Sequence, residues 1–103
     1  MFPTHVGQRT QVLNMIELKM IIKNERGLHA RASAKLVEVV ESFDADCEIS
    51  KNNVSVSGDS IMGLLMLAAS KGSCISIKVC GNQCKELLEA IRNLVENRFN
   101  EDY

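Results

Sequence analysis

Hydrophobic residues recur along this chain at two different spacings, and the order of these spacings leaves few possible folds. Some segments carry a hydrophobic residue at every second position, which is typical of a strand with one buried face. Others carry one at every third or fourth position, which is typical of a helix with one buried stripe. The order strand, helix, strand, strand, helix, strand, helix therefore predicts helices interleaved with the strands of a single sheet.

The alternating segments predict four strands. The first is expected over residues 16–23. The segments "DCEIS" and "VSVSG" flank "KNN", whose asparagines tolerate positive φ, so we expect a hairpin there. The fourth strand is expected in "CISIKVC".

Three segments have helical periodicity. The first helix is expected over residues 30–43, and the second over residues 60–70, with Ser60 as N-cap and Gly72 just after its end. The buried stripe of the first helix consists of Leu36, Val37, Val40 and Phe43. The third helix closes the chain, with a hydrophobic face of Cys84, Leu87, Leu88, Ile91, Leu94, Val95 and Phe99.

These elements predict an α+β fold, an open-faced β-sandwich. Its four-stranded, mainly antiparallel sheet carries three helices on one face, in the order β-α-β-β-α-β-α. The other face of the sheet would meet water, since the alternate strand positions are polar. These positions are Glu17, Lys19, Glu48, Ser50, Ser55 and Lys78.

The length of 103 residues suits one domain, and we place it at residues 16–103. Residues 1–15 are expected to form an N-terminal extension, because they are polar and show no sustained periodicity. Three readings of this extension remain open: disorder, an additional element, or a translation start at Met15.

The charge of the chain argues against several partner classes. The net charge is −1 with no cluster of basic residues, and only four aromatic residues could stack on bases, so we expect no nucleic-acid binding. No apolar run is long enough to span a bilayer, and the first residues do not resemble a secretory signal. We therefore expect no membrane insertion and a cytoplasmic location.

The four cysteines do not have the spacing of a metal site. They form no CxxC pair, and no histidine lies close to them in sequence, so we expect no bound metal and reduced thiols. A redox-active pair of Cys80 and Cys84 is the alternative.

His29 and Arg31 stand at the predicted start of the first helix. A helix N-terminus presents unpaired N–H groups and favours an anion. A neutral imidazole is a nucleophile near pH 7, and a guanidinium is shaped for phosphate oxygens. The two side chains could accept and hold a phosphoryl group. On spacing alone, an exposed loop histidine and a solvated first-turn charge are the more common interpretation.

The segments "GLHARASAKLV" and "SGDSIMGLLMLAASKGS" resemble the two signature segments of the HPr family, the histidine-containing phosphocarrier proteins of the bacterial phosphotransferase system. The resemblance spans about residues 16–100. It implies that His29 accepts a phosphoryl group on Nδ1 from enzyme I, that Arg31 stabilises the phosphate, and that IIA-type proteins receive it. The chain would then be a phosphoryl relay without a cofactor, not an enzyme acting on small molecules. Ala32 departs from the family pattern, in which proline is common, and predicts a more flexible helix start.

The second segment is hydrophobic on all sides of a short helix, so some of its side chains must be exposed. The resemblance implies that Ile61, Met62 and Leu65 dock enzyme I and IIA partners, while Leu64 and Leu67 belong to the core. It also implies that Ser60 is the serine that HPr kinase/phosphorylase modifies in some bacteria. A plain helix cap explains Ser60 equally well.

Several alternatives remain. An RNA-binding domain or a metal-handling domain would need surfaces that the chain lacks. A regulatory carrier of the nitrogen-related branch, not coupled to sugar uptake, would use the same residues, and a binding module without phosphorylation would use only the docking residues. Because a carrier must release its partners quickly, we expect a monomer with transient interfaces.

Overall fold

The computed structural model describes residues 15–103. The predicted extension lies outside the described residues except for Met15, so its boundary stays a prediction. The elements are β1 (Met15–Ile21), α2 (Ala30–Glu41), β2 (Asp46–Lys51), β3 (Val54–Ser57), α3 (Ile61–Met66), β4 (Cys74–Cys80), α4 (Cys84–Glu96) and a 3₁₀ turn, η1 (Arg98–Asn100). This order confirms the predicted β-α-β-β-α-β-α arrangement.

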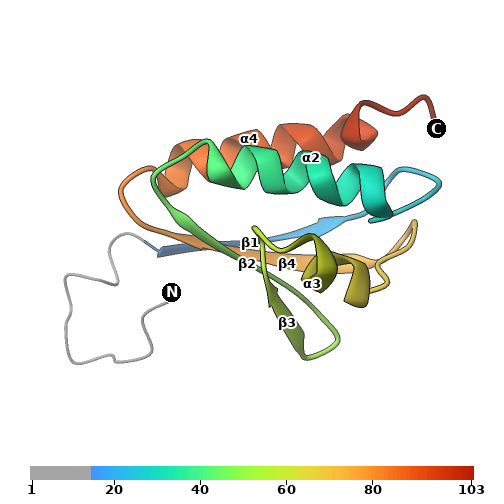
Figure 1. The fold of residues 1–103 in the computed structure, drawn as a ribbon, viewed down its shortest axis with the longest axis horizontal. Coiled ribbons are helices and arrows are strands. Elements are labelled where there is room, and N and C mark those ends of the chain that lie inside the picture. The colour runs from blue at the N-terminus through green and yellow to red at the C-terminus, as the bar shows by residue number, and fades with distance from the viewer. Residues whose placement is uncertain (1–14) are drawn as a thin grey trace.

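The four strands form one antiparallel sheet in the order β1-β4-β2-β3. Figure 1 shows α2 and α4 lying side by side along one face of the sheet, while the shorter α3 lies beside β3. The predicted hairpin joins β2 to β3, and its turn residues Asn52 and Asn53 have φ of 51° and 69°. Asparagine tolerates this left-handed conformation better than most residues do, which confirms the turn prediction.

The two faces of the sheet differ as the alternation predicts. Ile49, Ile77 and Val79 face the helices and are fully buried in the core. On the opposite face, Lys78 of β4 is paired in register with Glu17 of β1 and Glu48 of β2. Opposite charges on neighbouring strands stabilise this solvent-facing surface. Within residues 15–103, no helix has the length and hydropathy that crossing a membrane requires.

Two helices end earlier than predicted. The first ends at Glu41 instead of residue 43, where the Ser42 hydroxyl donates to the Glu38 carbonyl at 2.7 Å. The second ends at Met66 instead of residue 70, because Ala68 takes a left-handed φ of 51° that a right-handed helix cannot contain. Gly72 therefore does not stop the helix. It lies in the turn before β4, where its N–H donates to the Ile22 carbonyl at 2.8 Å.

The third helix agrees with the prediction up to Glu96, but Phe99 does not belong to it. Arg98, Phe99 and Asn100 have φ of 56°, 55° and 61°, three consecutive left-handed residues without a glycine. Each such residue costs about 1 kcal/mol or more, so packing must hold the turn. The Phe99 side chain is fully buried in the core and supplies that packing.

Candidate functional site

The loop before α2 is fixed by a close backbone approach at Gly27. Gly27 has a left-handed φ of 64°, and a Cβ atom there would lie 2.3 Å from the carbonyl oxygen of Ala69. The next residue, Leu28, donates its N–H to the same oxygen at 2.9 Å. Only glycine fits this position without displacing the backbone. The loop that leads to His29 is therefore packed against the segment that follows α3.

His29 is the N-cap residue of α2, as predicted for a helix start. Its backbone is extended, with φ −79° and ψ −177°, and its carbonyl accepts the Ser33 N–H at 2.8 Å. The imidazole makes no capping hydrogen bond, and the side chain is 24% exposed. The N–H groups of residues 30–32 precede the first intrahelical bond, so the ring lies beside the positive end of the helix dipole.

The histidine ring is held by a carboxylate from the other end of the chain. Its Nε2 lies 2.5 Å from Oε2 of Glu101, whose side chain is only 13% exposed. The other carboxylate oxygen, Oε1, accepts a hydrogen bond from Nδ2 of Asn24 at 2.9 Å. Asn24 is buried in the loop before α2 and also donates to the Gly27 carbonyl. Two segments far apart in sequence, the loop before α2 and the C-terminal tail, therefore meet at His29.

The environment of Glu101 favours its ionised form. Burial alone would raise the pKa of this carboxyl. Hydrogen bonds from Asn24 and His29, together with the positive charges of His29 and Lys35, outweigh burial and lower the pKa below its usual value. Since a carboxylate only accepts hydrogen bonds, Nε2 of the ring must be the donor. In a neutral imidazole the lone pair then lies on Nδ1, which makes no hydrogen bond within residues 15–103.

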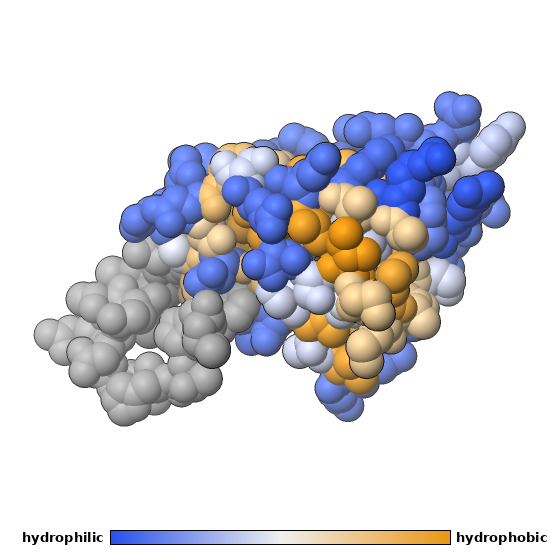
Figure 2. All heavy atoms as spheres, viewed as in Figure 1, coloured by the Kyte–Doolittle hydropathy of each residue, from blue (hydrophilic) through white to orange (hydrophobic). Residues whose placement is uncertain are grey.

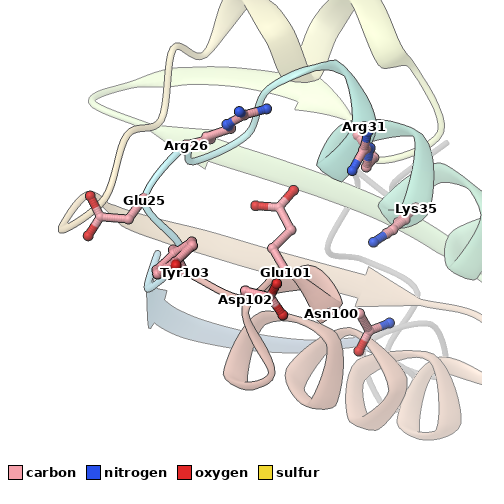
Figure 3. Close-up of a pocket in the computed structure, with 8 residues that line it drawn as sticks. All are labelled: Glu25, Arg26, Arg31, Lys35, Asn100, Glu101, Asp102 and Tyr103. Atoms are coloured by element: carbon pink, nitrogen blue, oxygen red, sulfur yellow. The ribbon is translucent and has the colours of Figure 1, made fainter.

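A pocket of about 460 Å³ opens next to this pair. Its lining residues are Glu25, Arg26, Arg31, Lys35, Asn100, Glu101, Asp102 and Tyr103. Figure 3 shows Glu101 projecting between Arg26 on one side and the α2 residues Arg31 and Lys35 on the other. Within residues 15–103 the guanidinium of Arg31 makes no hydrogen bond or ion pair, so it can receive an anion.

The sequence predicts His29 and Arg31 at the start of a helix, where the structure places both of them, but it gives no indication of Glu101. The carboxylate lies 72 residues after the histidine, in a tail beyond the periodic segments. No spacing rule connects two such distant residues. The only sequence signal is the acidic composition of "NEDY" at the end of the chain, which does not indicate which residue it contacts.

Ser60 is the N-cap of α3, which confirms the structural part of its prediction. Its backbone is extended, with φ −114° and ψ 109°, and its hydroxyl accepts the Gly63 N–H at 3.0 Å. This bond satisfies one of the unpaired donors of a helix that is only six residues long. The cap explains the serine without any modification.

Replacement of Ser60 by alanine should lower the free energy of unfolding by about 1 kcal/mol, because the Gly63 N–H loses its acceptor. Urea denaturation followed by circular dichroism would measure the loss. Ser70→Ala is the matched control, since the hydroxyl of Ser70 is exposed and makes no hydrogen bond among the described residues. Equal stabilities of the two variants would contradict the capping role.

The side chains of α3 divide into buried and exposed groups. Leu64 and Leu67 are buried in the core, as expected. Ile61, Met62, Leu65 and Met66 are exposed by 40%, 70%, 36% and 74%, and we call this group the α3 patch. Figure 2 shows hydrophobic residues gathered on this part of the surface. The sequence singled out the first three and missed Met66, which is the most exposed of the four.

The cysteines do not assemble into a site. All four are free. Burial, with a smaller contribution from Asp59 and Glu48, raises the pKa of Cys47 to about 12. Burial and Asp46 also raise the pKa of Cys80, which opposes the thiolate that redox chemistry needs. Among residues 15–103, no group of three or more histidine, cysteine or acidic residues could hold a metal ion.

Comparisons with known proteins agree with this geometry. The family profile described as "PTS HPr component phosphorylation site" matches residues 16–97. The phosphocarrier protein HPr of Xylella fastidiosa strain 9a5c is 42% identical over 88 residues, 85% of this chain and 99% of that protein. The phosphocarrier protein NPr of Shewanella violacea is 36% identical over 89 residues, 86% of this chain and 98% of that protein.

Solved structures show the same likeness. The crystal structure of HPr-C-His from Thermoanaerobacter tengcongensis is similar with a TM-score of 0.82 at 33% sequence identity, over 85% of this chain and 99% of that chain. Because the family profile ends at residue 97, Glu101 lies beyond the part of this chain that it matches.

Proposed function

Because this chain belongs to the HPr family of phosphocarrier proteins, we propose that it accepts a phosphoryl group on Nδ1 of His29 and transfers it to a second protein. The donor is phosphorylated enzyme I, and the acceptor is a IIA-type protein. The observation that carries the proposal is the histidine ring itself. Its Nε2 contacts Glu101, while Nδ1, at the N-terminus of α2, makes no hydrogen bond to any residue that the structure describes.

The site contains what phosphoryl transfer needs. This reaction depends on positioning and charge stabilisation more than on covalent help from many side chains. The N–H groups at the start of α2 and the guanidinium of Arg31 can stabilise the phosphate oxygens. The ring is partly exposed, so a donor protein can reach it. A single nucleophile, without a metal or cofactor, is sufficient for this role.

The experiment that tests the proposal is phosphorylation by enzyme I and labelled phosphoenolpyruvate. We expect one label per chain, lost in acid and stable in base, on His29 in peptide mapping. Running separate reactions with sugar-type and nitrogen-type enzyme I distinguishes the two branches. The enzyme that gives the faster reaction identifies the branch. Absence of label with both enzymes would overturn the proposal and leave a binding module.

The α3 patch is the proposed docking surface for both partners. The Leu28–Ala69 hydrogen bond ties the residue before His29 to the segment after α3, so the patch and the histidine belong to one region of the surface. Exposed methionine side chains adapt to partners of different shape. Such a small hydrophobic surface fits transient binding, and we propose that the protein acts as a monomer.

Replacement of Met62 by glutamate should raise the concentration of this protein that gives the half-maximal transfer rate about tenfold. The reason is that a charge replaces a hydrophobic side chain that the partner would bury. The maximal rate should change little, since Met62 does not contact the reacting atoms. Asn93→Glu adds the same charge at an exposed position of α4 and serves as the control. If both variants behave alike, charge repulsion and not the patch determines the rate.

Regulatory phosphorylation of Ser60 and the domain boundary at residue 16 stay predictions. A phosphate on Ser60 would add negative charge at the edge of the α3 patch and hinder an acidic partner. Incubation with HPr kinase/phosphorylase and ATP tests this directly, with a second HPr protein as positive control. If only the control is labelled, the cap is the entire role of Ser60.

A further inference from the structure

The contact between His29 and Glu101 is unusually well supported for a residue near the end of a chain. Asn24 donates to the carboxylate at 2.9 Å. On the near side of Glu101, Lys35 of α2 donates to the Phe99 carbonyl at 2.6 Å. On the far side, the Glu25 N–H donates to the Tyr103 carbonyl at 3.1 Å. The tail is therefore anchored before and after the carboxylate.

The left-handed turn at residues 98–100 makes this placement costly. Consecutive left-handed residues without glycine persist only where the surrounding structure holds them, and such strain collects at functional sites. The turn follows α4, and the tail after it continues toward the end of the molecule where α2 begins (Figure 1). The strained turn places the Glu101 carboxylate in contact with the His29 ring.

We propose that Glu101 is a positioning residue that holds the proton on Nε2 of His29 and thereby directs phosphorylation to Nδ1. The proposal rests on the proposed carrier function, but it concerns a residue outside the part of the chain that the family profile matches. Glu101 acts through the histidine and does not itself contact the phosphoryl group. Its role resembles that of a carboxylate that orients a catalytic imidazole.

The chemistry of transfer explains why the carboxylate is needed. The Nδ1 lone pair forms a bond to phosphorus, the bond between phosphorus and the donor atom breaks, and its electron pair returns to the donor. The proton stays on Nε2, so the phosphorylated ring carries a positive charge. A carboxylate that accepts the Nε2–H hydrogen bond stabilises this charge as it forms. Onward transfer reverses the same steps and returns a neutral ring.

Cationic side chains near the ring oppose its positive form. The titratable groups of the pocket come from the loop before α2, from α2 and from the tail. They are Glu25, Arg26, Arg31, Lys35, Glu101, Asp102 and Tyr103, which ends the chain. The three cations disfavour a positive ring, and Glu101 is the anion in direct contact with it. The carboxylate therefore offsets repulsion from cations that include Arg31, the side chain proposed to hold the phosphate.

The test measures which ring nitrogen reacts, and it needs no partner protein. Potassium phosphoramidate phosphorylates histidine when a ring nitrogen attacks phosphorus and the P–N bond breaks, releasing ammonia with the bonding electrons. NMR of the ¹⁵N-labelled protein distinguishes the Nδ1 and Nε2 products. The variants are Glu101→Ala, which removes the acceptor, and Glu101→Gln, which keeps an acceptor oxygen but removes the charge. Asp102→Ala is the control, because it removes a neighbouring carboxylate that is exposed.

In the wild-type protein and in Asp102→Ala we expect the Nδ1 product to predominate. In Glu101→Ala the ratio of Nδ1 to Nε2 product should fall about tenfold, because Nε2 becomes accessible and the proton is no longer fixed. Glu101→Gln should retain Nδ1 selectivity. Both variants should react more slowly than the wild-type protein, because both lose the negative charge that stabilises the positive ring as it forms. A purely structural role of Glu101 would not produce one effect in both variants while changing the product ratio in Glu101→Ala alone.

Two results would overturn the inference: an unchanged product ratio in Glu101→Ala, or predominant Nε2 product in the wild-type protein. Circular dichroism and thermal unfolding confirm that each variant is folded. Failure of the carrier function looks different, because it is absence of label with enzyme I while phosphoramidate still reacts at Nδ1. Normal labelling by enzyme I with an unchanged product ratio would retain the carrier function and reject the role of Glu101.

Discussion

Replacement of His29 by alanine is expected to abolish phosphoryl acceptance from enzyme I and to leave the fold intact. In the proposed reaction the imidazole of His29 is the nucleophile, and residues 15–103 contain no other imidazole that could substitute for Nδ1. The N-cap contribution is made by the backbone carbonyl, which alanine retains. The imidazole–carboxylate contact is partly exposed, so its loss should cost about 1 kcal/mol or less of folding stability. Labelled phosphoenolpyruvate measures the first effect and urea denaturation the second.

The chain provides a matched control in its other histidine. His5→Ala removes the same side chain and leaves His29 in place, so its labelling should equal that of the wild-type protein. Label that persists in His29→Ala and disappears in His5→Ala would move the acceptor to the other histidine. Label in both single variants would mean either that both histidines accept the phosphoryl group or that the acceptor is not a histidine. A label that is stable in acid would identify the second case.

Replacement of Phe99 by alanine is expected to have the largest effect on stability, about 3–5 kcal/mol. Its ring is fully buried and holds three left-handed residues in place. Without the ring, the turn loses the packing that compensates for its strain, and the Lys35–Phe99 hydrogen bond should weaken with it. We therefore expect two measurable results. The free energy of unfolding should fall, and the NMR signals of the His29 ring should shift because the ring loses its contact with Glu101.

Tyr103→Ala is the control for Phe99, because it removes an aromatic ring of the same tail that is 76% exposed. Its backbone carbonyl still accepts the Glu25 N–H, so its stability should change by less than about 0.5 kcal/mol. If Phe99→Ala costs as little as the control, the left-handed turn does not depend on the buried ring. Loss of stability with an unchanged ring signal would show that Glu101 reaches His29 without the turn.

The fold could be predicted from the sequence because its information is local and periodic. Alternation in β4 and the regular hydrophobic face of α4 each lie within a few turns of chain, and burial then fixes which side faces the core. The end of α3 could not be predicted in this way. Ala68 adopts a left-handed conformation although alanine favours a right-handed helix. Its neighbours Leu67 and Ala69 are buried and its carbonyl accepts a hydrogen bond from Lys51, and these tertiary contacts leave no local sequence signal.

The candidate site likewise contains residues that the sequence predicts and one, Glu101, that it does not. His29, Arg31 and Ser60 follow from motifs at helix starts, where residue type and position determine the chemistry together. The position of Glu101 depends on the left-handed turn at residues 98–100. Glycine is the residue that usually adopts this conformation, and the turn contains none. Because no glycine marks the turn, the periodicity predicts a helix that extends to Phe99. It gives no reason to place the Glu101 carboxylate beside His29.

The register of β1 has a practical consequence for attaching tags and dyes. Met15 pairs with Cys80, whereas Ile21 at the other end of the strand pairs with Cys74 and leads to the loop before His29. The C-terminus, in contrast, lies at the His29 end of the molecule (Figure 1). A purification tag or surface linker fused after Tyr103 should therefore disturb Glu101, and immobilisation through the C-terminus should block partner access. A tag attached ahead of Met15 joins β1 at the end of the strand opposite to the loop before His29, and it should leave the transfer kinetics unchanged.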